Sequence, residues 1–265
     1  MQISRTSRIG FSTLTLLGFA FIYVPLIVVV INSFNSSNSL SWPPKGFSTK
    51  WWVKMFGNDG VRSAVGTSVV IALIATVLAL VLGTLAAAAL TRYDFFGKQT
   101  VSLMFVLPIA LPGIVTGIAL NNVFTSVLGG LTLFTVIAGH ATFCTVVVFN
   151  NVAARYRRLG QSLEDASADL GAGKWLTFRY VTFPLLRSAL VAAGLLSFAL
   201  SFDEIIVTTF TAGAGVRPLP IWIYENLFRP TQAPIVSAVA AALIILSIVP
   251  IYLAQRMANT HTGIE

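Results

Sequence analysis

The chain is 265 residues long, and its composition is strongly apolar and basic. Hydrophobic residues make up 56% of the positions and charged residues only 10%, whereas ordinary soluble domains contain about 45–50% and about 25%. These proportions argue against a water-soluble fold. The formal net charge of +8 does not indicate nucleic-acid binding either, because no soluble face interleaves basic and aromatic residues.

Six apolar segments are long enough, at about 20 residues, to cross a bilayer as helices. They cover residues 11–31, 64–90, 101–124, 131–152, 185–210 and 235–254. The first is too long for a secretory signal, and no small-residue cleavage site follows it. The apolar runs do not alternate as the strands of a membrane β-barrel do. The sequence therefore predicts an all-α membrane protein with six transmembrane helices in a single domain, residues 1–265.

The basic residues are distributed unequally between the two sides of these spans. An even number of spans places both termini on one side, and eleven of the 17 Lys and Arg residues fall there. Because cytoplasmic loops carry an excess of Lys and Arg, we expect cytoplasmic N- and C-termini. Basic residues at helix ends meet anionic lipid headgroups, so membrane lipid, and no nucleic acid, accounts for the positive charge.

The loop between the first two spans contains Trp42, Trp51 and Trp52. Tryptophan is enriched at membrane interfaces, so an aromatic belt is one interpretation. The alternative is that these rings receive a docking protein.

The third span carries features beyond hydrophobicity. Pro108 and Pro112 interrupt its helix, which a membrane tolerates only where other groups take up the freed backbone carbonyls. We therefore expect an internal, irregular helix. Gly113 and Gly117 form a small-xxx-small pair and Asn121 continues the same face, which predicts close packing against another helix.

The fourth span contains His140, a polar residue inside the predicted bilayer. A place in the transport path is one interpretation, since intramembrane polar residues are functional candidates. The other is a neutral imidazole satisfied by neighbouring helices. The single cysteine, Cys144, forms no internal disulfide, and no Cys/His spacing suggests a metal site, so we expect no metal and no cofactor.

The loop at 153–184 is a polar island between the fourth and fifth spans. Residues 161–170 follow a short helical pattern, Gly171 and Gly173 end it, and Pro184 opens the next span. We expect a compact helix, turn and second helix, an element suited to transmitting force. The alternative is a solvated loop lying on the headgroups.

Two adjacent acids, Asp203 and Glu204, lie toward the outer end of the fifth span. An ionised carboxylate at mid-bilayer costs about 2.5–3.5 kcal/mol, so these acids must face water, protein or a cation. On a continuous helix one stripe would carry Ser197, Ser201, Glu204 and Thr208, with Asp203 at its edge. We interpret this stripe as the lining of a polar path. The alternative places both acids at the interface or pairs them with a partner subunit.

The polar loop resembles the signature E-A-A-x-x-x-G-x9-I-x-L-P of permease subunits of bacterial ABC importers. The matching residues are Asp165, Ala166, Ser167, Gly171, Val181, Phe183 and Pro184. Asp165 stands in place of the Glu, Ser167 of the second Ala, Val181 of the Ile and Phe183 of the Leu. Residues 107–117 and 200–210 resemble permeases of spermidine/putrescine-type importers, which commonly carry two adjacent acids where this chain has Asp203 and Glu204.

This resemblance implies a type I ABC importer permease fold in the bacterial cytoplasmic membrane, with two six-span permeases around a pseudo-twofold pore. It implies three partners: a pair of cytoplasmic ATP-binding subunits that receive the loop helix, a second and non-identical permease, and an extracytoplasmic solute-binding protein. The chain itself lacks the G-x-x-x-x-G-K-[ST] loop, so we expect it not to be an enzyme. The implied substrate is a polyamine, and the looser similarity to iron(III) and thiamine permeases leaves those solutes open.

Two hypotheses from other classes remain at this point. A self-contained secondary transporter or channel would use Asp203, Glu204 and His140 as a cation relay and would need no ATP. An integral membrane enzyme is the weaker alternative, because the paired acids have no companion histidine or metal-ligand cluster arranged for catalysis.

Overall fold

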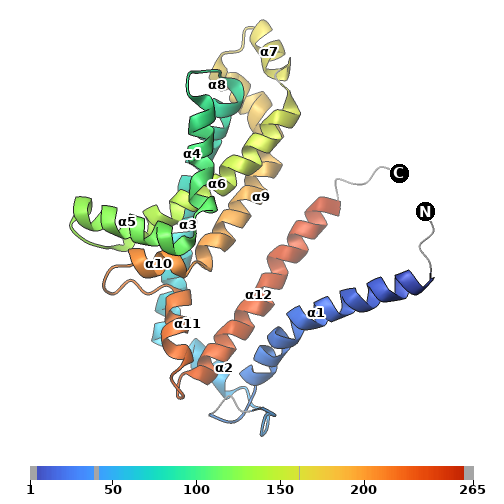
Figure 1. Cartoon of the computed structure of the whole chain (residues 1–265), viewed down its shortest axis with the longest axis vertical. Coiled ribbons are helices and arrows are strands. Elements are labelled where there is room, and N and C mark those ends of the chain that lie inside the picture. Colours follow the sequence, from blue (N-terminus) through green and yellow to red (C-terminus); the bar gives the residue numbers. More distant parts are fainter. Residues whose placement is uncertain (1–4, 39–41, 161, 260–265) are drawn as a thin grey trace. The chain divides into compact units, whose positions relative to one another are not determined.

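The structure is a computed structural model that describes residues 5–38, 42–160 and 162–259. Within these ranges it is helical, and its only strand-like feature is an isolated antiparallel bridge between Asn35 and Phe47 (Figure 1). The longer helices are α1 (Arg5–Ser33), α3 (Asp59–Arg92), α4 (Lys98–Ala110), α5 (Gly113–Leu128), α6 (Leu133–Leu159), α9 (Phe183–Phe202) and α12 (Ala233–Asn259). The shorter ones are α2 (Lys50–Phe56), α7 (Ser162–Asp169), α8 (Lys174–Thr177), the π-helical turn η1 (Phe178–Thr182), α10 (Ile206–Thr211) and α11 (Leu219–Leu227).

The chain divides into two compact units. Met1–Arg62 and Ile223–Glu265 form the first, and Ser63–Trp222 form the second. In the first unit α12 packs against both α1 and α2. The features that bear on function lie in the second unit.

The chain between α1 and α3 folds around a tryptophan. Trp51 is 3% exposed, and its indole Nε1–H donates to the backbone oxygen of Asn35 at 2.8 Å. Trp52 stacks on Phe34, whereas Trp42 is exposed. The belt interpretation is therefore wrong for Trp51, because a buried carbonyl satisfies its polar edge and the ring packs inside the loop.

Within the described residues, four helices are long and apolar enough to span a membrane, and they contain most or all of the first, second, fourth and fifth predicted spans. The third predicted span is instead a pair of helices, α4 and α5, bent by 108°. Counted as one broken span, this pair raises the number to five, and a shorter apolar helix, Ala233–Ser247, falls within the sixth predicted span. The division into six spans stays a prediction.

The bend falls at Leu111 and Pro112, between the two helices. Proline supplies no N–H there and disfavours helix in the residue before it, so Pro112 ends α4 and starts a new direction. The predicted irregularity is confirmed. Internal burial is not seen in the single chain, where α4 contains no buried residue.

The small-residue face of α5 packs against α10, as the sequence predicted. A Cβ atom on Gly117 would lie 2.6 Å from the ring of Phe210, and one on Gly113 would lie 3.4 Å from Ile206. Asn121 Nδ2 donates a hydrogen bond to the backbone oxygen of Phe210 at 2.6 Å. Glycine therefore permits the close approach, and the amide then fixes the pair.

The core of the second unit lies where α6 meets α3 and α9, with a cluster of buried residues drawn from all three helices and from α10. Small side chains make this contact close. A Cβ atom on Gly83 of α3 would lie 2.7 Å from Cβ of Val148 on α6, nearer than real Cβ atoms come. Only glycine fits this position without displacing one of the helices.

Candidate functional site

The polar loop forms the predicted helix, turn and second helix. Helix α7 ends at Asp169, and Gly171 follows with a left-handed φ of +83°. The N–H of Gly171 donates to Ala168 O at 2.8 Å, and the N–H of Ala172 donates to Ser167 O at 3.1 Å. This is a glycine C-cap, in which a residue without a Cβ closes the helix at no steric cost.

Helix α7 is fastened to the rest of the second unit by Glu164. Its Oε2 forms an ion pair with Arg92 Nε at 2.8 Å, and its Oε1 accepts a hydrogen bond from Thr182 Oγ1 at 2.9 Å. The Arg92 guanidinium also donates to Gly160 O and lies over the ring of Tyr156. Both partners of the ion pair are mostly buried, with side chains 14% and 23% exposed, so it is better shielded than a surface pair.

Sequence reasoning missed Glu164 and Arg92. The family signature pointed to Asp165, which neighbours Glu164 but is turned about 100° from it on the helix. Arg92 is far away in the chain, at the end of α3, and no spacing rule connects it to the loop. The one sequence feature that could have pointed to Glu164 was its position next to the signature acid Asp165.

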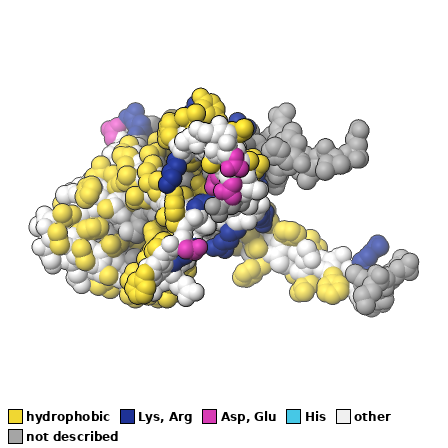
Figure 2. Space-filling view, turned by 90° about the horizontal axis from the view of Figure 1, so that it is seen from above, with side chains coloured by type: hydrophobic (Ala, Val, Ile, Leu, Met, Phe, Trp, Pro, Cys, Tyr) yellow, Lys and Arg dark blue, Asp and Glu magenta, His cyan; other side chains and the backbone are white. Residues whose placement is uncertain are grey.

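The outward face of the loop presents the signature residues and several large hydrophobic side chains. Asp165, Ala166 and Gly171 are exposed, while Ser167 is half-buried and bonds to Thr177 through their hydroxyls at 3.0 Å. The exposed apolar side chains of the loop are Leu163, Leu170, Trp175, Leu176, Tyr180 and Phe183. Figure 2 views the end of the chain that carries α7 and shows acidic, basic and hydrophobic side chains together on it. Such a surface on a soluble loop is typical of a protein interface.

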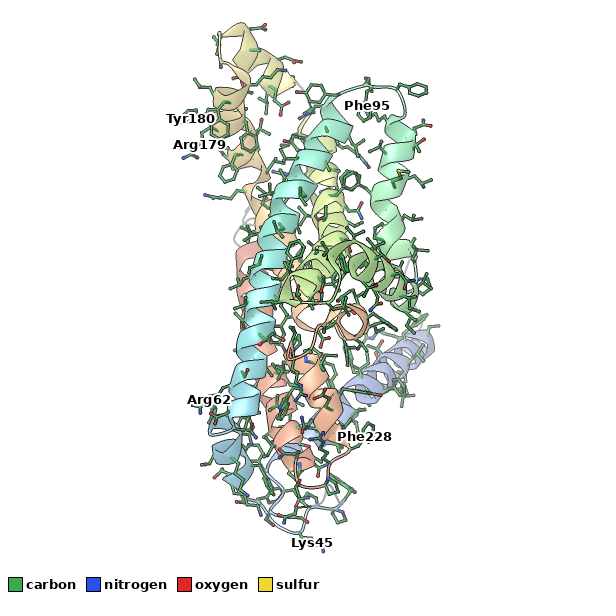
Figure 3. The ribbon with its side chains drawn as sticks, turned by 90° about the vertical axis from the view of Figure 1, so that its left-hand side faces the viewer. Lys45, Arg62, Phe95, Arg179, Tyr180 and Phe228 are labelled. Carbon is green, nitrogen blue, oxygen red and sulfur yellow. The ribbon has the colours of Figure 1, made fainter. Side chains whose placement is uncertain are left out.

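The second helix of the loop continues directly into the membrane segment. Val181 lies in η1, and Phe183 and Pro184 open α9, as predicted. However, α8, η1 and α9 follow without a break and make one apolar helix of 29 residues, Lys174–Phe202. The wider π-helical turn precedes Pro184, which cannot donate a backbone hydrogen bond, so the bulge lets the helix pass through the proline. Arg179 and Tyr180 point outward from this turn (Figure 3).

His140 is the centre of a buried polar cluster that joins α6, α9 and α10. Its Nδ1 lies 2.7 Å from Ser201 Oγ and its Nε2 lies 2.8 Å from Thr208 Oγ1. The Thr208 hydroxyl donates its single proton to Glu204 O at 2.7 Å, so His140 Nε2–H donates to the Thr208 oxygen. Both ring nitrogens are therefore used to hold α6 against α9 and α10, which favours the interpretation of an imidazole satisfied by neighbouring helices.

The fifth span is not the continuous helix that the sequence suggested. Helix α9 ends at Phe202, the chain turns through Asp203, Glu204 and Ile205, and α10 starts at Ile206. Glu204 Oε1 accepts the backbone N–H of Val207 at 2.8 Å and so caps α10. A carboxylate at a helix N-terminus satisfies a free N–H and the helix dipole, which gives a local reason for the break.

The break separates the predicted stripe into two groups. The hydroxyls of Ser197, Ser201 and Thr208 are buried against α6, and Ser197 contacts the backbone of Cys144. Asp203 is exposed and Glu204 is half-buried. Only the two acids are accessible to a solute in the single chain, and a path through the hydroxyl stripe stays a prediction.

The α7 loop and the acidic turn both lie in a part of the chain that matches a known protein family. Residues 79–260 match the family described as binding-protein-dependent transport system inner membrane component. The chain belongs to this family. The match includes the α7 loop, the His140 cluster and the acidic turn, so all the features above lie inside the family's region.

The chain is also similar to named permeases. It is 34% identical over 237 residues to the putrescine transport system permease protein PotI of Escherichia coli (strain K12), covering 86% of this chain and 83% of that protein. It is 37% identical over 246 residues to the spermidine/putrescine transport system permease protein PotC of Haemophilus influenzae, covering 92% and 95%. These relatives confirm the resemblance to spermidine/putrescine-type permeases.

Solved structures confirm the fold. A bacterial ABC transporter involved in the import of the acidic polysaccharide alginate contains a chain that matches with a TM-score of 0.75 and 16% identity, covering 99% of this chain and 100% of that one. The type I importer permease fold predicted from the sequence is therefore present. As a member of a binding-protein-dependent transport system, the permease does not fit the hypothesis of a self-contained transporter.

Proposed function

We propose that this chain is the transmembrane permease subunit of an ATP-driven importer that carries a polyamine, putrescine or spermidine, across the bacterial cytoplasmic membrane. The similarity to PotI and PotC over most of the chain carries the proposal. A pair of cytoplasmic ATP-binding subunits supplies the energy, a non-identical second permease completes the pore, and an extracytoplasmic protein delivers the solute. Both termini lie in the cytoplasm, on the side where the basic residues gather.

The coupling part of the proposal rests on the exposed face of α7. A helix docked into an ATPase needs accessible contact residues and a firm attachment to the permease, and α7 has both. Asp165 and the exposed leucines face outward, while the ion pair between Glu164 and Arg92 fastens the helix to α3. The glycine cap at Gly171 sets the direction in which the chain leaves α7.

The continuous helix Lys174–Phe202 connects the coupling loop to the acidic turn. At a rise of 1.5 Å per residue, its 29 residues span about 43 Å. Closure of the ATP-binding pair would push on the α7–α8 end, and this helix would carry the displacement to Asp203 and Glu204. Movement of the turn then opens or closes the path beside the two acids.

The substrate part of the proposal rests on those acids. A polyamine is a polycation, and its ammonium groups are attracted to carboxylates far more strongly in a low-dielectric path than in water. Asp203 is exposed and Glu204 keeps one carboxylate oxygen beyond the oxygen that caps α10. Permeases for iron(III) or thiamine are the alternative, since those solutes carry positive charge as well.

Uptake measurements in right-side-out membrane vesicles or intact cells test the substrate part. Asp203→Asn and Glu204→Gln each remove a charge, and glutamine keeps an oxygen that can accept the Val207 N–H, so the cap survives. We expect both variants to reduce putrescine and spermidine uptake, and thiamine to compete poorly in the parent. Unchanged uptake affinity and rate in both variants would remove these acids from the path.

The coupling part is tested separately with the assembled transporter. Asp165→Asn changes an exposed side chain that makes no hydrogen bond or ion pair to a described residue, so we expect normal assembly of the membrane part but weaker stimulation of ATP hydrolysis by the loaded binding protein. Accumulation of solute by the isolated chain, without ATP, would contradict the whole proposal.

A further inference from the structure

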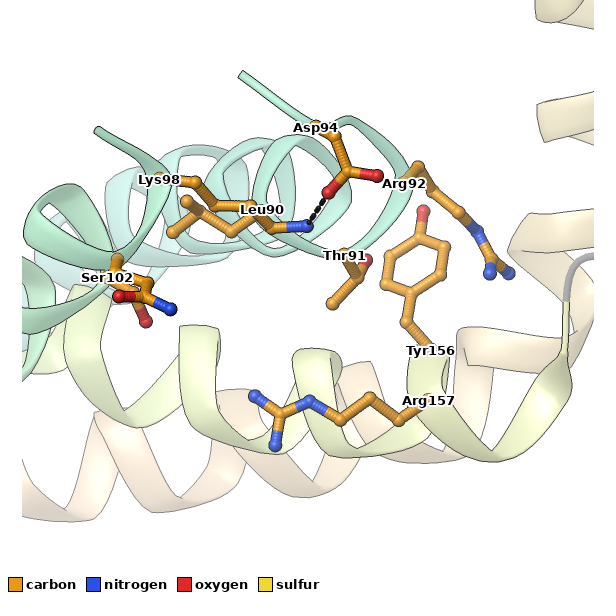
Figure 4. Close-up of a pocket in the computed structure, with 9 residues that line it drawn as sticks. Leu90, Thr91, Arg92, Asp94, Lys98, Ser102, Tyr156 and Arg157 are labelled. Carbon is orange, nitrogen blue, oxygen red and sulfur yellow. Dashed lines mark hydrogen bonds and ion pairs between the residues drawn. The ribbon is translucent and has the colours of Figure 1, made fainter. Parts of the chain in front are cut away.

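A basic pocket of about 550 Å³ opens at the α7 end of the second unit, between the end of α3, the start of α4 and the end of α6. Its lining includes Arg92, Lys98, Ser102, Tyr156 and Arg157 (Figure 4). Three positive charges therefore surround it.

Acids compensate two of these three positive charges and leave the third unmatched. Asp94 pairs with Lys98 at 2.9 Å, but its side chain is 99% exposed and stands at the rim. The Arg92 charge is matched by Glu164. Among the side chains that the structure describes, none pairs with Arg157, which enters from α6 on the side opposite the Lys98–Asp94 pair in Figure 4. The pocket thus has hydrogen-bond donors and unmatched positive charge, which fits an anion and disfavours a polyamine.

The same three helices enclose a second pocket farther along their length. It has a volume of about 490 Å³ and is lined almost wholly by apolar groups, among them Leu78 and Leu82 of α3, Met104 of α4, and Ala138 and Val146 of α6. No charged side chain lines it. Such a cavity suits a hydrocarbon chain.

The spacing of the two pockets matches the dimensions of a lipid. Along α3 the rise from Leu82 to Leu90 is about 12 Å, and along α6 the rise from Val146 to Tyr156 is about 15 Å. Half of the hydrocarbon core of a bilayer is also about 15 Å thick. Phe105 lines the apolar pocket about one helical turn along α4 from Ser102 of the basic pocket, and its ring stacks on Phe149 with centroids 5.3 Å apart.

We propose that the two pockets are the ends of one binding site for an anionic phospholipid. Its phosphate group lies in the basic pocket beside Arg157 and Lys98, and an acyl chain runs past Phe105 into the apolar pocket. Arg92 lines the basic pocket and also holds α7 through Glu164, so the lipid headgroup lies beside the attachment of the α7 loop. Lipid binding at this site is independent of which solute the permease carries.

The test uses the permease purified with the subunits that accompany it, and native mass spectrometry after titration with phosphatidylglycerol or phosphatidylcholine of equal chain length. Arg157→Gln removes the unmatched charge. Arg158→Gln is the matched control, since Arg158 is the next residue of the same helix end, is exposed, and does not line the pocket. Ala138→Leu fills part of the apolar pocket without changing any charge.

We expect the parent to bind phosphatidylglycerol more tightly than phosphatidylcholine. Arg157→Gln should weaken phosphatidylglycerol binding about fivefold, the factor that corresponds to about 1 kcal/mol for one basic residue near a membrane surface. Arg158→Gln should leave it within about twofold, and Ala138→Leu should weaken both lipids. Gel filtration checks that each variant remains assembled, and Lys98→Gln replaces Arg157→Gln should the latter fail to assemble.

Three results would overturn the proposal. The first is equal binding of the two lipids by the parent, and the second is an equal effect of Arg157→Gln and Arg158→Gln. The third is release of phosphatidylglycerol by millimolar inorganic phosphate with no effect of Ala138→Leu, which would identify a site for free phosphate rather than for a lipid.

Discussion

The clamp around His140 makes a quantitative prediction through Thr208. The hydroxyl of Thr208 donates to Glu204 O at 2.7 Å and accepts from His140 Nε2 at 2.8 Å. Thr209, the next residue, makes the same kind of bond to Ile205 O at 2.7 Å, but it is exposed and does not contact the histidine. Replacing each threonine by valine keeps the shape and removes the hydroxyl, so the two variants differ chiefly in the bond to His140.

The expected cost follows from the burial of the imidazole. An average hydrogen bond between membrane helices contributes about 0.6 kcal/mol, whereas a buried donor left without a partner costs about 1–3 kcal/mol. His140 is only 1% exposed and its second nitrogen is already used by Ser201, so the larger figure applies. At about 2–4 °C per kcal/mol, Thr208→Val should lower the melting temperature by about 2–12 °C, and Thr209→Val by less than about 2 °C.

Thermal unfolding of the purified, assembled transporter, followed by tryptophan fluorescence, measures both variants. Substrate uptake is measured alongside, because loosening α10 from α6 also frees the acidic turn, and we expect Thr208→Val to reduce uptake more than Thr209→Val. Equal melting temperatures for the two variants would refute the clamp, since the bond to His140 would then contribute nothing to holding the helices.

Three further predictions concern the loop and the core. Gly171→Ala forces a Cβ into a left-handed conformation and should cost about 1–2 kcal/mol and impair coupling of ATP hydrolysis to uptake, whereas Gly173→Ala, at φ −70° with open space around it, should do neither. Glu164→Gln removes the ion pair to α3 and should raise proteolytic cleavage of the loop, measured against the parent under native conditions. Gly83→Ala should lower the melting temperature, because overpacking costs about 1–3 kcal/mol, while Gly66→Ala on the same helix, with nothing nearby, should raise it slightly.

Sequence reasoning recovered the features that depend on local chemistry. The apolar runs, the glycine cap after α7, the irregular third span and the close contact of Gly113 and Gly117 with another helix all follow from one segment at a time. The family and the polyamine resemblance followed from contiguous motifs, which the comparisons confirmed.

What the sequence did not predict depends on contacts between distant segments. Periodicity treated residues 185–210 as one helix, because a carboxylate that caps the next helix cannot be told from one that lines a path until its oxygen is seen against Val207 N. The partnership of Glu164 with Arg92 was hidden for the same reason. The helix was also expected to start anew at Pro184, and only the π-helical turn before it reveals that the helix passes through.

The uninterrupted helix Lys174–Phe202 connects the α7 loop, the acidic turn and the His140 clamp. In the proposed coupling, a displacement applied at Trp175, in the exposed loop, passes Pro184 within one helix, because the π-helical turn keeps that helix continuous. Regular helix first stops at the turn of Asp203 and Glu204. The same turn is held on its far side by Thr208, through His140, to α6. In the proposed function, force from the α7 loop and resistance from the clamp meet at the two acids, which is where a gate for a polycation would need to respond.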